Sequence, residues 1–80
     1  MDERVVAGYA RDLGFLVREL AVRARREWEE GRQGEDARYL AGRLSALHEI
    51  VSLMQDQAVA FGIDLEDVAL DGFDADRDLL

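Results

Sequence analysis

Apolar residues recur at alternating steps of four and three in both halves of the chain, and this heptad spacing restricts the fold more than any other feature. The spacing places these residues on one face of an α-helix, because seven residues make almost two helical turns. In the second half the apolar line consists of Leu40, Leu44, Leu47, Val51, Met54, Ala58 and Phe61. In the first half it consists of Val6, Tyr9, Leu13, Leu16 and Leu20. The pattern predicts an all-α fold in which two long helices pack on each other.

Glycines and acidic residues indicate where the helices begin and end. The expected elements are a helix over about residues 3–30, a turn over 31–34, a helix over about 35–61, a short helix over about 64–70 and an acidic tail over 71–80. The first helix is expected to stop at Gly31, Gly62 suits the left-handed conformation that closes many helices, and Asp64 suits an N-cap. The sequence therefore predicts a single helical domain over residues 1–80, an antiparallel hairpin with a short C-terminal helix.

The apolar arcs on both helices are wider than one neighbouring helix covers. On the second helix, Ile50 and Leu53 lie beside the main apolar line, and on the first, Phe15 and Val22 lie on another side. Burying one such side chain is worth about 1.5 to 3 kcal/mol. Leaving several of them in water therefore favours association with another surface.

These arcs predict a homodimer in which two hairpins form a four-helix bundle. The alternative is a monomer in which the short third helix and the tail fold back over the surplus apolar surface. The residues assigned to the core or the dimer interface are Leu40, Leu44, Leu47, Ile50, Val51, Leu53, Met54, Phe61, Phe15 and Val22.

Composition excludes several classes of protein. With 80 residues, no cysteine and one histidine, the chain has no disulfide and no set of zinc ligands to support a small core. No segment approaches the roughly 18 to 20 apolar residues of a membrane span, and the acidic start is unlike a signal peptide. We therefore expect a soluble cytoplasmic protein of a bacterium or phage that does not bind a membrane.

Motifs for catalysis or metal binding are incomplete. His48 and the residue after it begin like a zinc-protease motif, but Ser52 stands where the second histidine belongs. The tail from Asp74 resembles the opening of a calcium loop, yet Leu79 replaces the required glycine. We predict a protein that is not an enzyme and has no catalytic residue, no metal site and no cofactor.

The net charge of −8 lies entirely in the second half of the chain. Residues 1–34 hold seven acids and seven arginines, whereas residues 64–78 hold seven acids and one arginine. Such an acidic segment steers basic partners electrostatically, although acids also serve solubility and helix capping. The predicted acidic partner-binding residues are Asp64, Glu66, Asp67, Asp71, Asp74, Asp76 and Asp78. The predicted apolar anchors among them are Phe73, Leu79 and Leu80.

A series of arginines recurs at intervals of seven on the first helix: Arg4, Arg11, Arg18, Arg25 and Arg32. The series is interpreted as a solvated face with local ion pairs, or as a surface that docks on acids of another subunit or partner. Interleaved acids argue against nucleic-acid binding, because nucleic-acid binders usually have a net positive domain.

In size and charge the chain resembles the immunity proteins that neutralise toxins and phage-encoded inhibitors of host enzymes. The acidic cluster with its apolar anchors predicts a non-enzymatic inhibitor or adaptor. Its acidic C-terminal region would cover a basic surface of a target protein, for example a nucleic-acid-binding surface, and would mimic nucleic acid there. The alternative function is a structural or assembly homodimer, in which the wide apolar helix faces are themselves the functional surface.

Overall fold

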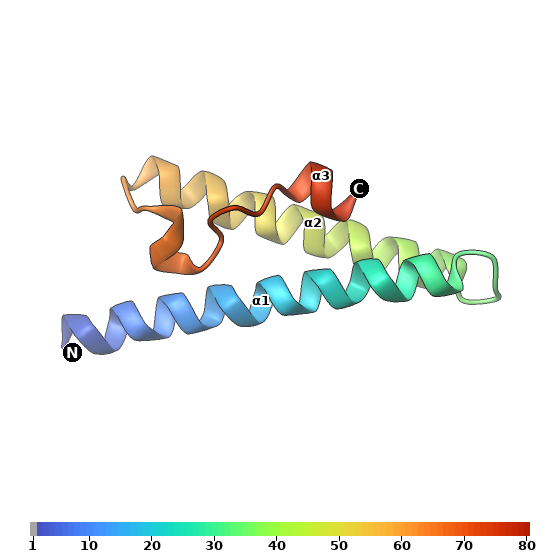
Figure 1. Ribbon diagram of the computed structural model, residues 1–80, viewed down its shortest axis with the longest axis horizontal. Helices are drawn as coiled ribbons and strands as arrows, with labels where there is room; N and C mark the ends of the chain where they lie inside the picture. The colour runs from blue at the N-terminus through green and yellow to red at the C-terminus, as the bar shows by residue number, and fades with distance from the viewer. Residues whose placement is uncertain (1) are drawn as a thin grey trace.

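A computed structural model of the chain describes residues 2–80, and over these residues it contains helices and no β-strand. The elements are α1 (Glu3–Gly31), α2 (Ala37–Ala60), the 3₁₀ turn η1 (Leu65–Val68) and α3 (Ala75–Leu79). Helices α1 and α2 form an antiparallel hairpin that sets the 47 Å length of the molecule (Figure 1). The predicted all-α fold of two long helices and a short one is confirmed. None of the helices over residues 2–80 is long and apolar enough to cross a membrane.

Local capping interactions define the beginning of α1 and the end of α2. The Asp2 carboxylate accepts a hydrogen bond of 2.8 Å from the Arg4 backbone N–H, which satisfies a free donor of the first turn. At the other end, Gly62 has a φ of +69°, and the Ile63 N–H donates to the Ala58 carbonyl at 2.8 Å. This is the Schellman arrangement that glycine favours. It turns the chain back towards the hairpin.

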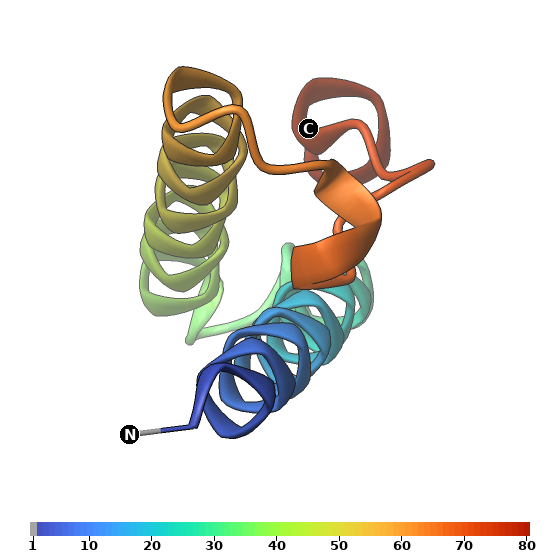
Figure 2. The ribbon, with the colours of Figure 1, turned by 90° about the vertical axis from the view of Figure 1, so that its left-hand side faces the viewer.

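Residues 63–80, named here the C-terminal segment, run back along one side of the hairpin (Figure 1). The helix expected over about 64–70 is a single 3₁₀ turn, and the expected tail contains a further short helix. The Asp74 side chain caps that helix by accepting from the Arg77 backbone N–H at 3.0 Å. Seen along the long axis, α1, α2 and the C-terminal segment occupy the corners of a triangle (Figure 2). The expectation that the C-terminal residues fold back over the hairpin is thus correct for this one side of it.

The core lies where the three segments meet. Its buried residues are Ala21, Ala24, Leu44, Val51, Leu70, Phe73, Ala75 and Leu79. Val17, Trp28, Leu47, Met54 and Val68 pack against them while remaining partly exposed. Helix α2 thus contributes the apolar line that its heptad spacing predicts except at its end, where Phe61 is 76% exposed. Half of the buried core residues come from the C-terminal segment.

The buried face of α1 differs from the predicted one. Gly14 and Ala21 are buried, whereas Leu13 and Leu20 of the predicted apolar line are 42% and 38% exposed. Small residues face inward because the C-terminal segment approaches the α1 backbone closely. A Cβ atom on Gly14 would lie only 1.7 Å from the carbonyl oxygen of Val68. The large apolar side chains of α1 are therefore left on the outside of the hairpin.

Candidate interaction surfaces

The C-terminal segment is held by side chains that bind its backbone. Arg18, Arg25 and Gln55 each donate hydrogen bonds to two carbonyl groups of the segment. The acceptors are Ala69 and Asp71 for Arg18 (3.2 and 2.9 Å), Leu79 and Leu80 for Arg25 (3.1 and 2.8 Å), and Leu70 and Phe73 for Gln55 (3.3 and 2.7 Å). Bonds from a charged donor are stronger than neutral ones. The segment is therefore an integral part of the fold.

The arginine series of α1 has several structural roles. Arg18 and Arg25 bind the C-terminal segment, and Arg4 forms an ion pair at the surface. The Arg32 guanidinium lies over the Trp28 ring, 5.3 Å from its centroid. Sequence reasoning expected local ion pairs or contacts with acids of another chain, and it missed the carbonyl contacts. Backbone acceptors have no signature in the sequence, so a pattern of charges could not reveal them.

Two of the three predicted apolar anchors are core residues of this chain. Leu79 is fully buried and Phe73 is 8% exposed, with the Arg18 guanidinium 4.9 Å from its ring centroid. Leu80 alone remains on the surface. In this fold Phe73 and Leu79 therefore pack inside the chain and are not exposed as partner anchors. These side chains interrupt the acidic sequence because they attach it to the hairpin.

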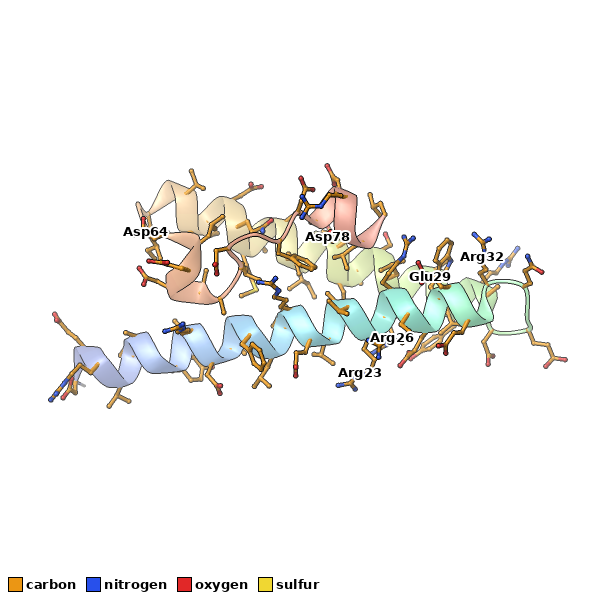
Figure 3. All side chains as sticks on the ribbon, in the orientation of Figure 1. Arg23, Arg26, Glu29, Arg32, Asp64 and Asp78 are labelled. Atoms are coloured by element: carbon orange, nitrogen blue, oxygen red, sulfur yellow. The ribbon has the colours of Figure 1, made fainter. Side chains whose placement is uncertain are left out.

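Three of the predicted acidic residues take part in the folded C-terminal segment. Asp74 caps α3, and Asp76 Oδ1 lies 2.7 Å from His48 Nε2. Asp78 accepts hydrogen bonds from the Arg77 side chain and the Asp74 backbone N–H, which lower the pKa of the Asp78 carboxyl from its usual 3.8 to about 2. Figure 3 shows Asp78 on α3. These three carboxylates thus have structural partners within the chain.

The other four predicted acidic residues are free of such partners. Asp64, Glu66, Asp67 and Asp71 are exposed, and their carboxylates make no hydrogen bond or ion pair within residues 2–80. Asp64 stands at the end of the hairpin opposite the turn, which is named here the open end (Figure 3). The acidic surface that remains available to a partner is therefore centred on the open end.

A second surface consists of large apolar side chains on the side of the hairpin away from the C-terminal segment. It is named here the uncovered face. Its residues are Val6, Tyr9, Leu13, Leu16 and Leu20 of α1 and Tyr39, Ile50, Leu53 and Phe61 of α2. Their exposed fractions run from 38% for Leu20 to 76% for Phe61. Figure 2 shows that no other segment of the described chain lies over this side.

An ion pair between the two helices locates the uncovered face. Glu27 of α1 accepts a hydrogen bond from Arg43 of α2, away from the arginines that bind the C-terminal segment. Leu20 precedes Glu27 by one heptad, and Ile50 follows Arg43 by one heptad, so each shares a helix face with one partner of this pair. The apolar residues of both helices therefore meet along one continuous surface.

The residues predicted for the core or dimer interface divide into four groups. Leu44 and Val51 are buried, Leu40, Leu47 and Met54 are half-buried, Ile50, Leu53 and Phe61 are on the uncovered face, and Phe15 and Val22 are exposed on another side of α1. Phe15 and Val22 lie beside Arg23 and Arg26, which point outward from the hairpin (Figure 3). The predicted set thus contains both core residues and exposed ones.

A groove of about 720 Å³ lies at the open end, between the first turns of α1 and η1. Its apolar lining consists of Val6, Ala7, Ala10, Ile63 and Val68, and its charged residues are Glu3, Arg11 and Asp67. The groove, named here the open-end groove, adjoins the uncovered face because Val6 belongs to both. Sequence reasoning missed it, since it depends on where η1 packs on α1.

Within residues 2–80, no three histidine or acidic side chains are grouped so that they could hold a metal ion. Comparison with protein-family models, curated proteins and solved structures finds no match for this chain. The surfaces themselves are therefore the basis for a functional proposal.

Proposed function

We propose that this chain is a non-enzymatic helix-packing module, two copies of which join through the uncovered face into a four-helix bundle. The observation that supports the proposal is the gathering of nine large apolar side chains on one exposed face. Burial of each is worth about 1.5 to 3 kcal/mol, and soluble monomers seldom expose contiguous apolar patches above a few hundred Å². A molecule of 47 by 20 Å has room for the roughly 800 Å² per partner of a standard interface.

The shape of the uncovered face favours a second hairpin as the occupant. It is formed by two long antiparallel helices, and a matching pair of helices completes the four-helix cross-section that such faces commonly form. A two-fold axis places the same residues of both copies in the interface, so a second copy supplies the complementary surface without any other partner. Such a module has a structural or assembly function, which is the alternative function predicted from the sequence.

The double variant Leu16→Glu, Leu53→Glu is expected to be a folded monomer. Both side chains are on the uncovered face, with exposed fractions of 48% and 58%, so the monomer tolerates a carboxylate there while a dimer interface would bury it unpaired. Sedimentation equilibrium measures the mass, and circular dichroism measures the helix content. Val59→Glu is the control, because Val59 is 72% exposed on α2 but faces the C-terminal segment.

The control variant should keep the wild-type mass. A wild-type chain that sediments as a monomer at its highest soluble concentration would exclude the proposed dimer. A double variant that still sediments as a dimer would place the interface elsewhere on the molecule.

A second candidate function is recognition of a basic target protein by the acidic open end, in an inhibitor or adaptor role. The supporting observation is that Asp64, Glu66 and Asp67 are exposed without internal partners, beside the exposed side chains of Phe61 and Ile63. Clustered carboxylates steer a basic surface, and exposed aromatic residues supply contact area. In this form of the proposal, Phe61 and Ile63 replace Phe73 and Leu79 as the apolar contacts.

Neutralising the open end should abolish the binding of such a target. The variant changes Asp64→Asn, Glu66→Gln and Asp67→Asn. Its control makes the same three-charge change outside the open end, with Glu19→Gln and Glu30→Gln on α1 and Glu49→Gln on α2. Both are used as baits in a lysate of the source organism, at low and at high salt. The expected result is a basic protein that the wild type and the control retain at low salt and the open-end variant loses. Equal retention by both variants would contradict the proposal.

A further inference from the structure

We infer that the second copy packs antiparallel, with the turn of one hairpin beside the open end of the other. In this arrangement Tyr39 of each copy occupies the open-end groove of the other copy. The inference rests on the proposed self-association through the uncovered face. It adds the direction of packing and names the residue that each copy contributes to its partner.

The first reason is the uneven charge along the hairpin. The turn end, residues 23–43, has six arginines and five acids. The open end, residues 2–12 and 56–68, has two arginines and seven acids. A parallel dimer would bring two open ends of net charge −5 together, within reach of the roughly 8 Å screening length at physiological salt. An antiparallel dimer places each acidic open end beside a turn end of net charge +1, which removes that repulsion.

The second reason is the distribution of side chains along the uncovered face. Its aliphatic residues lie mainly in the middle, whereas Tyr9 and Phe61 are near the open end and Tyr39 is near the turn. Antiparallel packing brings Tyr39 of one copy towards Tyr9 and Phe61 of the other. Aromatic side chains in such contact stabilise each other beyond the burial of their area. Parallel packing would instead bring the two copies of Tyr39 together.

The third reason is the open-end groove. It needs an apolar occupant, and antiparallel packing brings the turn end of the second copy to it. Over residues 23–46, Tyr39 is the only large apolar side chain that is exposed, with an exposed fraction of 69%. Its ring suits the apolar lining, and its hydroxyl suits the charged residues Glu3, Arg11 and Asp67 of the groove. The groove of one copy is therefore completed by a residue of the other.

Cysteine crosslinking tests the packing direction. The chain has no cysteine, so each introduced thiol is unique. Gln33→Cys places a thiol in the turn, and Asp64→Cys places one at the open end (Figure 3). The two variants are mixed and treated with a short thiol-specific crosslinker. The expected product joins position 33 of one copy to position 64 of the other. Predominant joining of two copies at position 33, or of two copies at position 64, would overturn the antiparallel arrangement.

Substitution of Tyr39 tests the groove. Tyr39→Ser is expected to raise the dissociation constant of the dimer about tenfold or more, because the free energy of burying one large side chain corresponds to at least that factor. Tyr39→Phe keeps the ring and should stay within a few fold of the wild type. Phe15→Ser is the control, since Phe15 is exposed on another side of α1. Unchanged dimerisation of Tyr39→Ser, with unchanged circular dichroism, would overturn the role of Tyr39.

The two proposals fail in different ways. A wild-type chain that never dimerises would overturn both of them. A dimer that dissociates in the Leu16→Glu, Leu53→Glu variant but crosslinks position 33 to position 33 would overturn only the antiparallel inference.

Discussion

Replacing Leu79 by alanine is expected to lower the free energy of unfolding by about 2 to 5 kcal/mol. Leu79, the last residue of α3, is fully buried against the hairpin, although it is the second-to-last residue of the sequence. Shortening it leaves a cavity among Leu44, Trp28 and their neighbours, which lie around the same site. A domain of this size is stable by roughly 4 to 12 kcal/mol, so the loss is a large part of the total.

The adjacent leucine is the matched control. Leu80 is 65% exposed, and Leu80→Ala should change the free energy of unfolding by no more than about 0.5 kcal/mol. Urea unfolding monitored by circular dichroism, at one protein concentration for all variants, measures both effects. Equal effects of the two substitutions would contradict the docking of the C-terminal segment in the core.

A methyl group at Gly14 is expected to destabilise the protein, whereas the same change at Gly8 should stabilise it. The Cβ atom of Gly14→Ala would lie 1.7 Å from the Val68 carbonyl oxygen. A backbone atom cannot rotate away, so α1 and η1 must move apart at a cost of about 1 to 3 kcal/mol. Around Gly8 there is open space, and alanine there removes the helix penalty of glycine, about 0.5 to 1 kcal/mol.

The two substitutions are informative together because their expected changes in the free energy of unfolding have opposite signs. Both glycines are in α1, so a general effect of helix propensity would shift the two variants in the same direction. Urea unfolding gives the sign and size of each change. Stabilisation by Gly14→Ala would show that η1 does not pack on α1 at this point.

Local sequence predicted the two long helices of this fold well, for a local reason. Helix boundaries depend on capping residues such as Asp2 and Gly62, whose effects act within a few positions of the chain. The buried line of α2, with Leu44 and Val51, was predictable because heptad spacing places these residues on one face of the helix. The spacing of apolar residues and the capping residues are properties of a single segment, so they can be read without knowing the tertiary structure.

The candidate site was less predictable. In α1 two faces competed for burial, and the smaller residues Gly14 and Ala21 are buried while Leu13 and Leu20 are exposed. The choice follows from how closely η1 approaches α1, which the spacing within one helix does not contain. From the sequence, the acidic segment was interpreted as a free partner surface. It is in fact attached to the hairpin through backbone carbonyls that residues such as Arg18 bind, and backbone acceptors have no signature in the sequence.

The sequence by itself determined two long amphipathic helices, a turn between them and an acidic second half, because these follow from residue spacing, capping and charge. Only the tertiary structure decided which apolar residues are used internally and which remain exposed. The physical reason is competition for one side of the hairpin. The C-terminal segment buries Leu70, Phe73 and Leu79 there against small residues of α1, and the large residues of α1 are left on the opposite side.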